Sequence, residues 1–500
     1  MLTLPPVLDA FAHNFKALAL RRVCRALRAA LADPGDLRVD AARWTPLWAV
    51  QERWAGLPLP HRALLARVAG REGDVDAVGW MAGEGLWDES GPAAAGAGRL
   101  AVLQQVTAEQ PGLPAGGVAF CVEAAGGGHI PVLQWLRAQQ LPWEVLALAG
   151  GDVWNGGVCE AAARSGHVRV LQWLRALQPP CPWGDACCAA AGGGHLEALQ
   201  WLRAQQPPCP WSAMTCADAA HNGHVAVLRW LREQPEPCPW DRTVCAAAAG
   251  GGHVSALQWL LSQPEPCPWD GSACAAAAGG GHVSALQWLR EQQPPCPWSA
   301  DACCAAAARG HVHVLQWLRA QQPPCPWDAW TCASAALNGR LGVLQWLRNQ
   351  QPPCPWSMRA CSFAAMNGHL EVLQWLRAQR PPCPWDQSAC AAAAGRGRIV
   401  VLQWLRAQQP PCPWGPWVCA DAAEAGELEV LQWLRGQGEP CPWDVGVCSA
   451  AARVGHLEVL QWLRAQQPPC PWDVGVCLAA REGRHDDVLQ WAIEHGCPVV

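Results

Sequence analysis

Apolar residues recur along this chain at helical spacing, in two short segments that are repeated many times. In the copy that begins at Cys354, residues 370–376 read Leu-Glu-Val-Leu-Gln-Trp-Leu, which places the apolar side chains on one face of a helix. A shorter helix is expected before it, from Ser357 to the Gly368-His369 step. The following Gln-Pro-Pro-Cys-Pro-Trp segment cannot continue a helix, because each proline lacks an amide donor and restricts the residue before it. The pattern predicts two helices and a linker in each copy.

The fourth residue of each copy predicts where the first helix begins. Asp and Ser are favourable N-cap residues, because a side-chain oxygen can accept a hydrogen bond from one of the first unpaired amides of a helix. Gly is also favoured at this position. Residues of these types occupy the position in ten successive copies: Ser212, Asp241, Asp270, Ser299, Asp328, Ser357, Asp386, Gly415, Asp444 and Asp473.

The tryptophan of the Leu-Gln-Trp-Leu motif, or of its variant Leu-Arg-Trp-Leu, marks the repeat. It recurs with a step of 29 residues at Trp201, Trp230, Trp259, Trp288, Trp317, Trp346, Trp375, Trp404, Trp433, Trp462 and Trp491. Upstream the spacing is looser, with Trp173 and Trp135 separated by an insertion around residues 143–151, and with Trp80 and Gln105 marking degenerate units. About fifteen units are expected.

Neither helix is long enough to be stable by itself, since isolated helices below about 12–15 residues are marginal in water. Stacked neighbours must bury their apolar faces together, which predicts an all-α solenoid of helix-turn-helix repeats. We expect a small helical segment over residues 1–60 and the array over residues 61–500. Within the array, degenerate units cover 61–140 and regular 29-residue units cover about 180–497.

Residues 364–373, Ala-Ala-Met-Asn-Gly-His-Leu-Glu-Val-Leu, resemble the ankyrin repeat, in which Ala-Ala-x-x-Gly-His precedes an outer helix. The resemblance implies an ankyrin-like fold with Cys361 and Trp375 at core positions. The period of 29 is shorter than the ankyrin period of about 33, and the missing residues fall where ankyrins carry a β-hairpin. We therefore expect no hairpin. A leucine-rich repeat is excluded, because the Leu-x-Leu strand that it requires does not occur.

The N-terminus has a fainter likeness. Leu4-Pro5-Pro6 followed by Val23-Cys24-Arg25 resembles an F-box, the helical module that joins a substrate adaptor to a ubiquitin ligase. The spacing is short and a characteristic tryptophan is absent. The resemblance implies a ubiquitin-ligase linker subunit as a partner of residues 1–60. The alternative is a helical cap that only shields the first repeat.

Charge and hydropathy limit the partners. The formal net charge is -5, and 15% of the residues are charged, so we expect no nucleic-acid partner. Asp9, His13 and Lys16 interrupt the apolar N-terminal stretch, so no secretory signal is predicted. No apolar run is long enough to span a membrane. The expected location is cytoplasmic or nuclear.

The cysteines form two ladders, one in Cys-Pro-Trp and one seven residues later. Zinc sites favour closely spaced cysteine pairs, and this spacing gives none, so we expect buried structural thiols, no metal and no cofactor. Equivalent cysteines of adjacent units are expected about 8–10 Å apart, which is too far for a disulfide. A reducing compartment is consistent with both expectations.

The polar residues do not form a catalytic set. Arginines end the second helices, where a cation complements the helix dipole, and an acidic or phosphorylated partner is the alternative role. The Gly-Gly-Gly-His segments follow helices and lack a Gly-Lys-Ser/Thr sequence, so a nucleotide site is not supported. A hydrolase, for example a lipid phosphodiesterase, would need unique reactive groups, whereas nearly every polar residue here is a copied repeat position. We expect no enzyme.

One position varies while its surroundings repeat. It is the sixth residue of the unit, two after the N-cap, and it reads Met214, Thr243, Ser272, Asp301, Trp330, Arg359, Ser388, Trp417, Gly446 and Gly475. Solenoids bind partners along extended concave surfaces, and Trp and Arg often dominate binding energy. The sequence therefore predicts a protein-interaction scaffold that binds through Met214, Thr243, Asp301, Trp330, Arg359, Ser388 and Trp417. Neutral drift at an exposed position is the alternative explanation.

Overall fold

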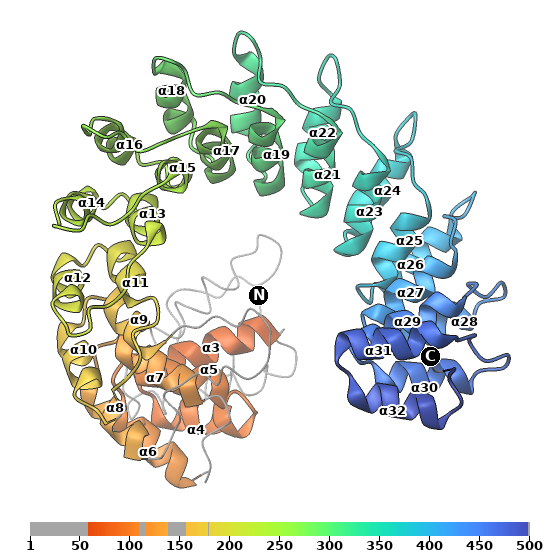
Figure 1. The fold of residues 1–500 in the computed structure, drawn as a ribbon, viewed down its shortest axis with the longest axis horizontal. Coiled ribbons are helices and arrows are strands. Elements are labelled where there is room, and N and C mark those ends of the chain that lie inside the picture. Colours follow the sequence, from red (N-terminus) through yellow and green to blue (C-terminus); the bar gives the residue numbers. More distant parts are fainter. Residues whose placement is uncertain (1–58, 110–116, 139–156, 179, 499–500) are drawn as a thin grey trace, which may run out of the picture. The chain divides into compact units, whose positions relative to one another are not determined.

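The computed structural model describes residues 59–109, 117–138, 157–178 and 180–498. These ranges contain thirty helices, α3 to α32, and no strand. The helices form fifteen pairs, and each pair is one repeat (Figure 1). The predicted all-α solenoid of repeated helix pairs is confirmed. The predicted N-terminal segment, the F-box-like motif and the insertion at 143–151 fall on residues outside the described ranges, apart from the last two residues of the segment.

The first helix of each pair is an odd-numbered helix. These are α3 (Leu59–Glu72), α5 (Trp87–Gly96), α7 (Gly117–Gly126), α9 (Val158–Arg164), α11 (Ala186–Gly192), α13 (Ala213–His221), α15 (Arg242–Gly250), α17 (Gly271–Gly280), α19 (Ala300–Arg309), α21 (Ala329–Leu337), α23 (Met358–Met366), α25 (Gln387–Ala394), α27 (Pro416–Glu424), α29 (Val445–Val454) and α31 (Val474–Gly483).

The second helices carry the even numbers. They are α4 (Val75–Gly83), α6 (Leu100–Glu109), α8 (Ile130–Ala138), α10 (Val168–Arg175), α12 (Leu196–Arg203), α14 (Val225–Arg232), α16 (Val254–Leu261), α18 (Val283–Glu291), α20 (Val312–Ala320), α22 (Leu341–Arg348), α24 (Leu370–Ala378), α26 (Ile399–Ala407), α28 (Leu428–Arg435), α30 (Leu457–Ala465) and α32 (Asp486–Glu494).

The chain divides into two compact units, Met1–Trp240 and Asp241–Val500. Within each unit, first helices pack closely against the first helix of the next repeat, whereas second helices of neighbouring repeats barely meet (Figure 1). Small side chains make this close approach possible: Ala364 and Ala365 of α23, for example, are completely buried. Each stack therefore has a dense layer of first helices and a looser layer of second helices.

The predicted N-caps are confirmed at all ten positions. The side chain of Asp444, for example, accepts the amide proton of Gly446 at 2.9 Å. At Ser212 the cap is reciprocal, since the Thr215 hydroxyl accepts the amide proton of Ser212 at 3.2 Å. Gly415 caps α27 without a side chain, and Pro416 at the first helical position fits because no amide donor is needed there.

The core of each repeat combines residues from both helices and the linker. In the repeat of α23 and α24, Cys361, Leu373 and Leu376 are fully buried. Trp375, which we expected in the core, is only partly buried. Its indole packs edge-on against Trp356 of the linker, with ring centroids 6.4 Å apart, because the loose layer of second helices leaves this side of the helix open.

Candidate functional site

The variable sixth residues lie on the first turn of the first helices. Met214, Trp330 and Trp417 are exposed by 55%, 47% and 67%, which are large values for apolar and aromatic side chains. Of the other predicted binding residues, Thr243, Asp301 and Arg359 are exposed and Ser388 is partly buried. The position is therefore accessible in most repeats.

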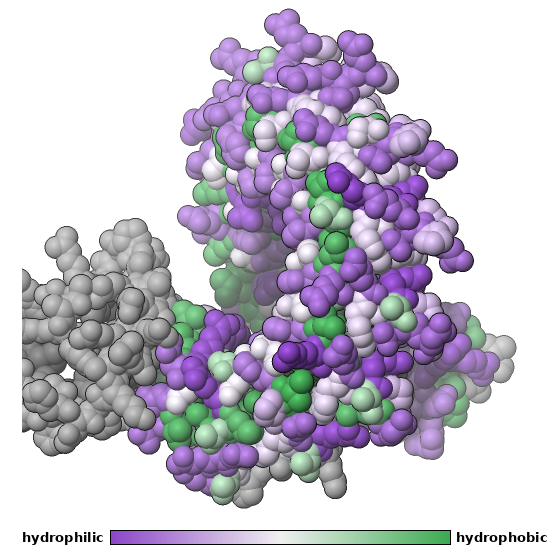
Figure 2. Space-filling view, turned by 90° about the vertical axis from the view of Figure 1, so that its left-hand side faces the viewer, coloured by the Kyte–Doolittle hydropathy of each residue, from purple (hydrophilic) through white to green (hydrophobic). Residues whose placement is uncertain are grey.

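Exposed large apolar side chains concentrate on the first helices. Among the described residues, nine of the eleven lie there: Leu59, Leu64, Met214, Trp330, Met358, Trp417, Val445, Val454 and Leu478. The other two, Val400 and Ile493, lie on second helices. Figure 2 shows the side on which α10 and α12 lie, where apolar groups are small and separated by polar side chains. Most of the exposed large apolar side chains in the described ranges therefore lie on the layer of first helices.

Two of the predicted residues contact each other. The guanidinium carbon of Arg359 on α23 lies 4.1 Å from the ring centroid of Trp330 on α21. On the same helix as Arg359, the ring of Phe363 lies 6.0 Å from that of Trp330, at an interplanar angle of 39°. We call Trp330, Arg359 and Phe363 the aromatic patch. Trp417 lies on α27, outside this patch, and Met214 belongs to the other unit.

Sequence reasoning missed Phe363. It occupies the tenth position of its unit, where other repeats carry Asp, Ala or Ser, and it is one of only four phenylalanines in the chain. A search for rare residue types at otherwise small positions could have found it. Next to it on α23, the hydroxyls of Ser362 and Ser388 lie 2.6 Å apart, so Ser388 bonds to the neighbouring repeat.

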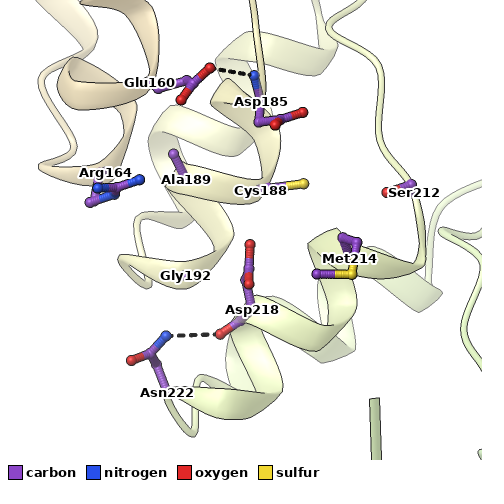
Figure 3. A pocket seen from close by; sticks show the side chains of 10 residues that line it. All are labelled: Glu160, Arg164, Asp185, Cys188, Ala189, Gly192, Ser212, Met214, Asp218 and Asn222. Carbon is purple, nitrogen blue, oxygen red and sulfur yellow. Dashed lines mark hydrogen bonds between the residues drawn. The ribbon is translucent and has the colours of Figure 1, made fainter. Parts of the chain in front are cut away.

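A second candidate is an open cavity of about 480 Å³ between α9, α11 and α13 (Figure 3). Its lining residues are Glu160, Arg164, Asp185, Cys188, Ala189, Gly192, Ser212, Met214, Asp218 and Asn222. The Glu160 carboxylate accepts the amide proton of Asp185 at 2.9 Å. Burial raises the pKa of Glu160 and of Asp218. Three carboxylates and one guanidinium give the cavity an acidic character.

The repeat frame uses the arginine ladder. Arg377 donates from Nη1 to the carbonyl of Cys383 at 2.6 Å, and its guanidinium carbon lies 3.9 Å from the ring centroid of Trp385. Trp385 in turn meets Trp404 of the next second helix edge-on. The expected helix-dipole role is therefore incomplete, because these arginines fasten the linker directly.

The histidine after glycine also belongs to the frame. The imidazole Nε2 of His369 is hydrogen-bonded to the carbonyl of Leu337 at 3.1 Å, which joins the start of α24 to the end of α21, the first helix of the previous repeat. Where arginine replaces it, Arg340 donates from Nε to the carbonyl of Ala308 at 3.3 Å. A donor therefore recurs at this position without being required, since Glu427 stands there before α28.

The cysteines of both ladders are buried, as expected, except Cys188, which is partly exposed, as is Cys304 beside the ladder residue Cys303. In the described ranges, no group of three or more His, Cys, Asp or Glu side chains is arranged to hold a metal ion. Over the same ranges, none of the helices combines the length and the apolar character needed to cross a membrane.

Comparison with known proteins adds little. No protein-family model matches the sequence, and no curated protein does. Among solved structures, the maize pentatricopeptide repeat protein PPR10 is similar, with a TM-score of 0.27 and 14% identity, over 90% of this chain and 81% of that chain. Two structures of PPR10 in complex with an 18-nt psaJ RNA element each have a TM-score of 0.22 and 14% identity, and the match covers 91% of this chain and 88% of the PPR10 chain. This similarity concerns the helical-repeat architecture alone.

The RNA complexes contradict our expectation that nucleic acid is excluded as a partner. In them a helical-repeat protein binds RNA. The expectation rested on the summed charge of the chain, whereas a binding surface depends on where charges lie. Net charge therefore does not decide the partner of a solenoid.

Proposed function

We propose that this chain is a non-catalytic scaffold that binds another protein along the exposed surface of its first helices, as ankyrin-repeat proteins do. The observation that carries the proposal is the aromatic patch, in which Trp330 stays 47% exposed although Arg359 and Phe363 pack against it. Exposed aromatic rings bury large area at little conformational cost when a partner covers them.

The neighbours of the patch also suit an interface. Met358 is 45% exposed one residue before Arg359, and Trp417 is 67% exposed two first helices further along the chain. Arginine stacked on tryptophan is held in place before binding, so less side-chain entropy is lost when it pairs with a carboxylate. The patch therefore favours a partner segment with apolar and acidic side chains.

The ankyrin-like assignment and the absence of catalysis belong to the same proposal. The repeated arginine, histidine and glutamine side chains hydrogen-bond within the frame, for example from Gln379 Nε2 to the Trp375 carbonyl at 3.1 Å. Groups occupied in this way are not available as nucleophiles or bases. Buried thiols suit a reducing compartment, cytoplasmic or nuclear. The adaptor alternative is a proposal about residues 1–60 alone.

Site-specific photo-crosslinking tests the proposal. A photoreactive phenylalanine analogue at position 417 is compared with the same analogue at position 400, because Trp417 and Val400 are exposed by 67% and 65% but lie on a first and a second helix. We expect protein adducts from position 417 only. Equal adducts from both positions would contradict a binding face on the first helices.

The captured protein is then purified and titrated against the triple variant Trp330→Ala, Arg359→Ala, Phe363→Ala. Hot-spot residues typically contribute about 2 kcal/mol each, so the variant should bind at least about 30-fold more weakly. The matched control is Val400→Ala with Ile493→Ala, which truncates exposed apolar side chains on second helices. Unchanged affinity of the triple variant, with an unchanged melting curve, would exclude the aromatic patch.

A further inference from the structure

The two exposed tryptophans of the sixth position differ in what covers their rings. Trp330 on α21 is covered from the next repeat, since the guanidinium carbon of Arg359, also a sixth residue, lies 4.1 Å from the ring centroid. Trp417 on α27 holds the equivalent place and is exposed by 67%, against 47% for Trp330. The guanidinium on Trp330 therefore shows which kind of group the same place beside Trp417 can hold.

The repeat after Trp417 supplies no such side chain. Its first helix, α29, carries Gly446 at the sixth position and Ala450 at the tenth, and neither residue can reach back to the ring. Apart from its chain neighbours and the backbone of its own helix, a Cβ built on Gly446 would meet only the side chain of Asp444, at 3.0 Å. No cation of the described ranges stacks on Trp417. The face of this indole is therefore accessible to a group from outside the chain.

A carboxylate lies beside the uncovered ring. Asp421 follows Trp417 by four residues on α27, which places both side chains on one face of the helix. Burial, and then the nearby Glu424 carboxylate, raise the pKa of Asp421. Glu424 is paired with Arg453 of α29 at 2.7 Å, whereas Asp421 has no ion pair among the described residues. The tenth residue of the α21 repeat is instead Ser334, so the carboxylate accompanies the tryptophan that lacks an arginine.

We propose that Trp417 and Asp421 bind an arginine side chain of the partner, stacked on the indole as Arg359 is stacked on Trp330. The inference rests on the proposed function, because the arginine belongs to the protein that the scaffold binds. A guanidinium stacks on an indole face through cation–π attraction, and its N–H groups can donate to a neighbouring carboxylate. Lysine fits less well, since its ammonium group is a strongly hydrated point charge without a planar face.

A first test supplies the guanidinium from the chain itself. Gly446→Arg places an arginine at the sixth position of α29, where a side chain is tolerated because Trp330 follows its N-cap Asp328 in the same way. Gly446→Gln is the matched control, since glutamine is also long and polar but uncharged. We expect hydrogen exchange in α27 and α29 to be about two- to fivefold slower in the arginine variant than in the glutamine variant.

The difference should vanish when Trp417→Leu is added. It should also be absent between Gly475→Arg and Gly475→Gln, because the preceding sixth residue is then Gly446 rather than a tryptophan. No difference between the two Gly446 variants, or an equal difference with Trp417→Leu, would overturn the proposal.

A second test offers the guanidinium as a ligand to the full chain. The reporter is a trifluoromethyl-phenylalanine at position 445, because Val445 is 40% exposed and lies one residue before Gly446. The chain is titrated with acetyl-Gly-Arg-Gly-amide and with the same peptide containing citrulline, which keeps the shape of arginine without its charge. We expect the arginine peptide to shift the fluorine NMR signal and to bind at least about fivefold more tightly than the citrulline peptide.

Variants of the reporter chain locate the site. Trp417→Leu, Asp421→Asn and Gly446→Arg should each weaken binding of the arginine peptide about two- to fivefold, with unchanged melting curves. Val400→Ala, at an exposed side chain of a second helix, is the control and should leave the affinity unchanged. Equal affinity for the arginine and citrulline peptides, tighter binding of a lysine peptide, or unchanged affinity in Trp417→Leu would each overturn the proposal.

The results also separate this site from the proposed function. Protein adducts from position 417 without any response to the arginine peptide would overturn the arginine site and leave the scaffold standing. Binding of the arginine peptide without protein adducts from position 417 would support the guanidinium site and contradict the scaffold.

Discussion

At the scale of single residues, the most informative contact is the stacking of arginine on the linker tryptophan. It recurs with distances of 3.8 to 4.2 Å from guanidinium carbon to ring centroid, as in Arg203 over Trp211 and Arg290 over Trp298. The same arginines donate to the linker carbonyl, so one side chain fixes both the backbone and the ring. Cation–π contacts of this kind are worth about 0.5–2 kcal/mol.

Leu261 stands where the other regular repeats carry this arginine. The tryptophan of the following linker, Trp269, therefore has no guanidinium stacked on it from residue 261. We predict that Leu261→Arg raises the free energy of unfolding by about 0.5–1 kcal/mol, because the contact forms at a partly exposed site. Arg377→Leu is the reverse substitution and should lower it by a similar amount. Thermal melting of both variants checks the prediction, and a shift of the same sign in both would contradict it.

At the scale of the helix, capping determines where each first helix begins. Asp241 and Asp270 accept hydrogen bonds from the hydroxyl and the amide of Thr243 and Ser272, respectively. These bonds, from the hydroxyl first, lower the pKa of both carboxyls. Arg242 lies 3.2 Å from Asp270 and acts in the same direction. The charged form is therefore the one that the folded state stabilises.

A lowered carboxyl pKa in the folded state adds stability above the unfolded pKa of about 3.9, and this stability is lost as pH falls through the folded value. We predict that Asp241→Asn with Asp270→Asn leaves the helices capped, since Asn caps about as well as Asp. The double variant should lose less unfolding free energy than the parent between about pH 5 and pH 2. Denaturant titrations across this range measure the difference, and parallel pH profiles would contradict the assignment.

At the scale of the whole molecule, stability follows from contacts between neighbouring repeats within each unit. First helices carry most of these contacts, and second helices also contact the preceding linker through tryptophan pairs such as Trp356 and Trp375. A stack of this kind behaves as a sum of repeat energies and nearest-neighbour interfaces, so damage to one repeat stays near it.

Leu373→Ala tests this locality. Leu373 is fully buried in α24, and its truncation should cost about 2–5 kcal/mol. We expect hydrogen exchange to increase strongly in α23 and α24, less in the flanking repeats, and not in α30. Val400→Ala, at a side chain exposed by 65%, is the control and should change stability by less than about 0.5 kcal/mol. Uniform acceleration along residues 241–498 would show global rather than local coupling.

The helices, their caps and the burial of Cys361 and Leu373 were predictable from the sequence, because each depends on residues close together within one repeat. The repeat count was predictable for the same reason, since a periodic tryptophan marks the copies except the one at Gln105. The exposure of the sixth position also followed from helix geometry. Its role in binding stays a prediction.

Only the tertiary structure decided which side chains meet. Trp330 contacts Arg359, which holds the equivalent position of the next repeat, and also Phe363, which holds a different position, so the comparison of equivalent positions gave no hint of the second contact. Trp375 is partly buried because second helices stand apart, which no pattern within one repeat can show. Local chemistry determines the elements of a solenoid, whereas the spacing between its repeats determines which residues become its surface and which side chains meet.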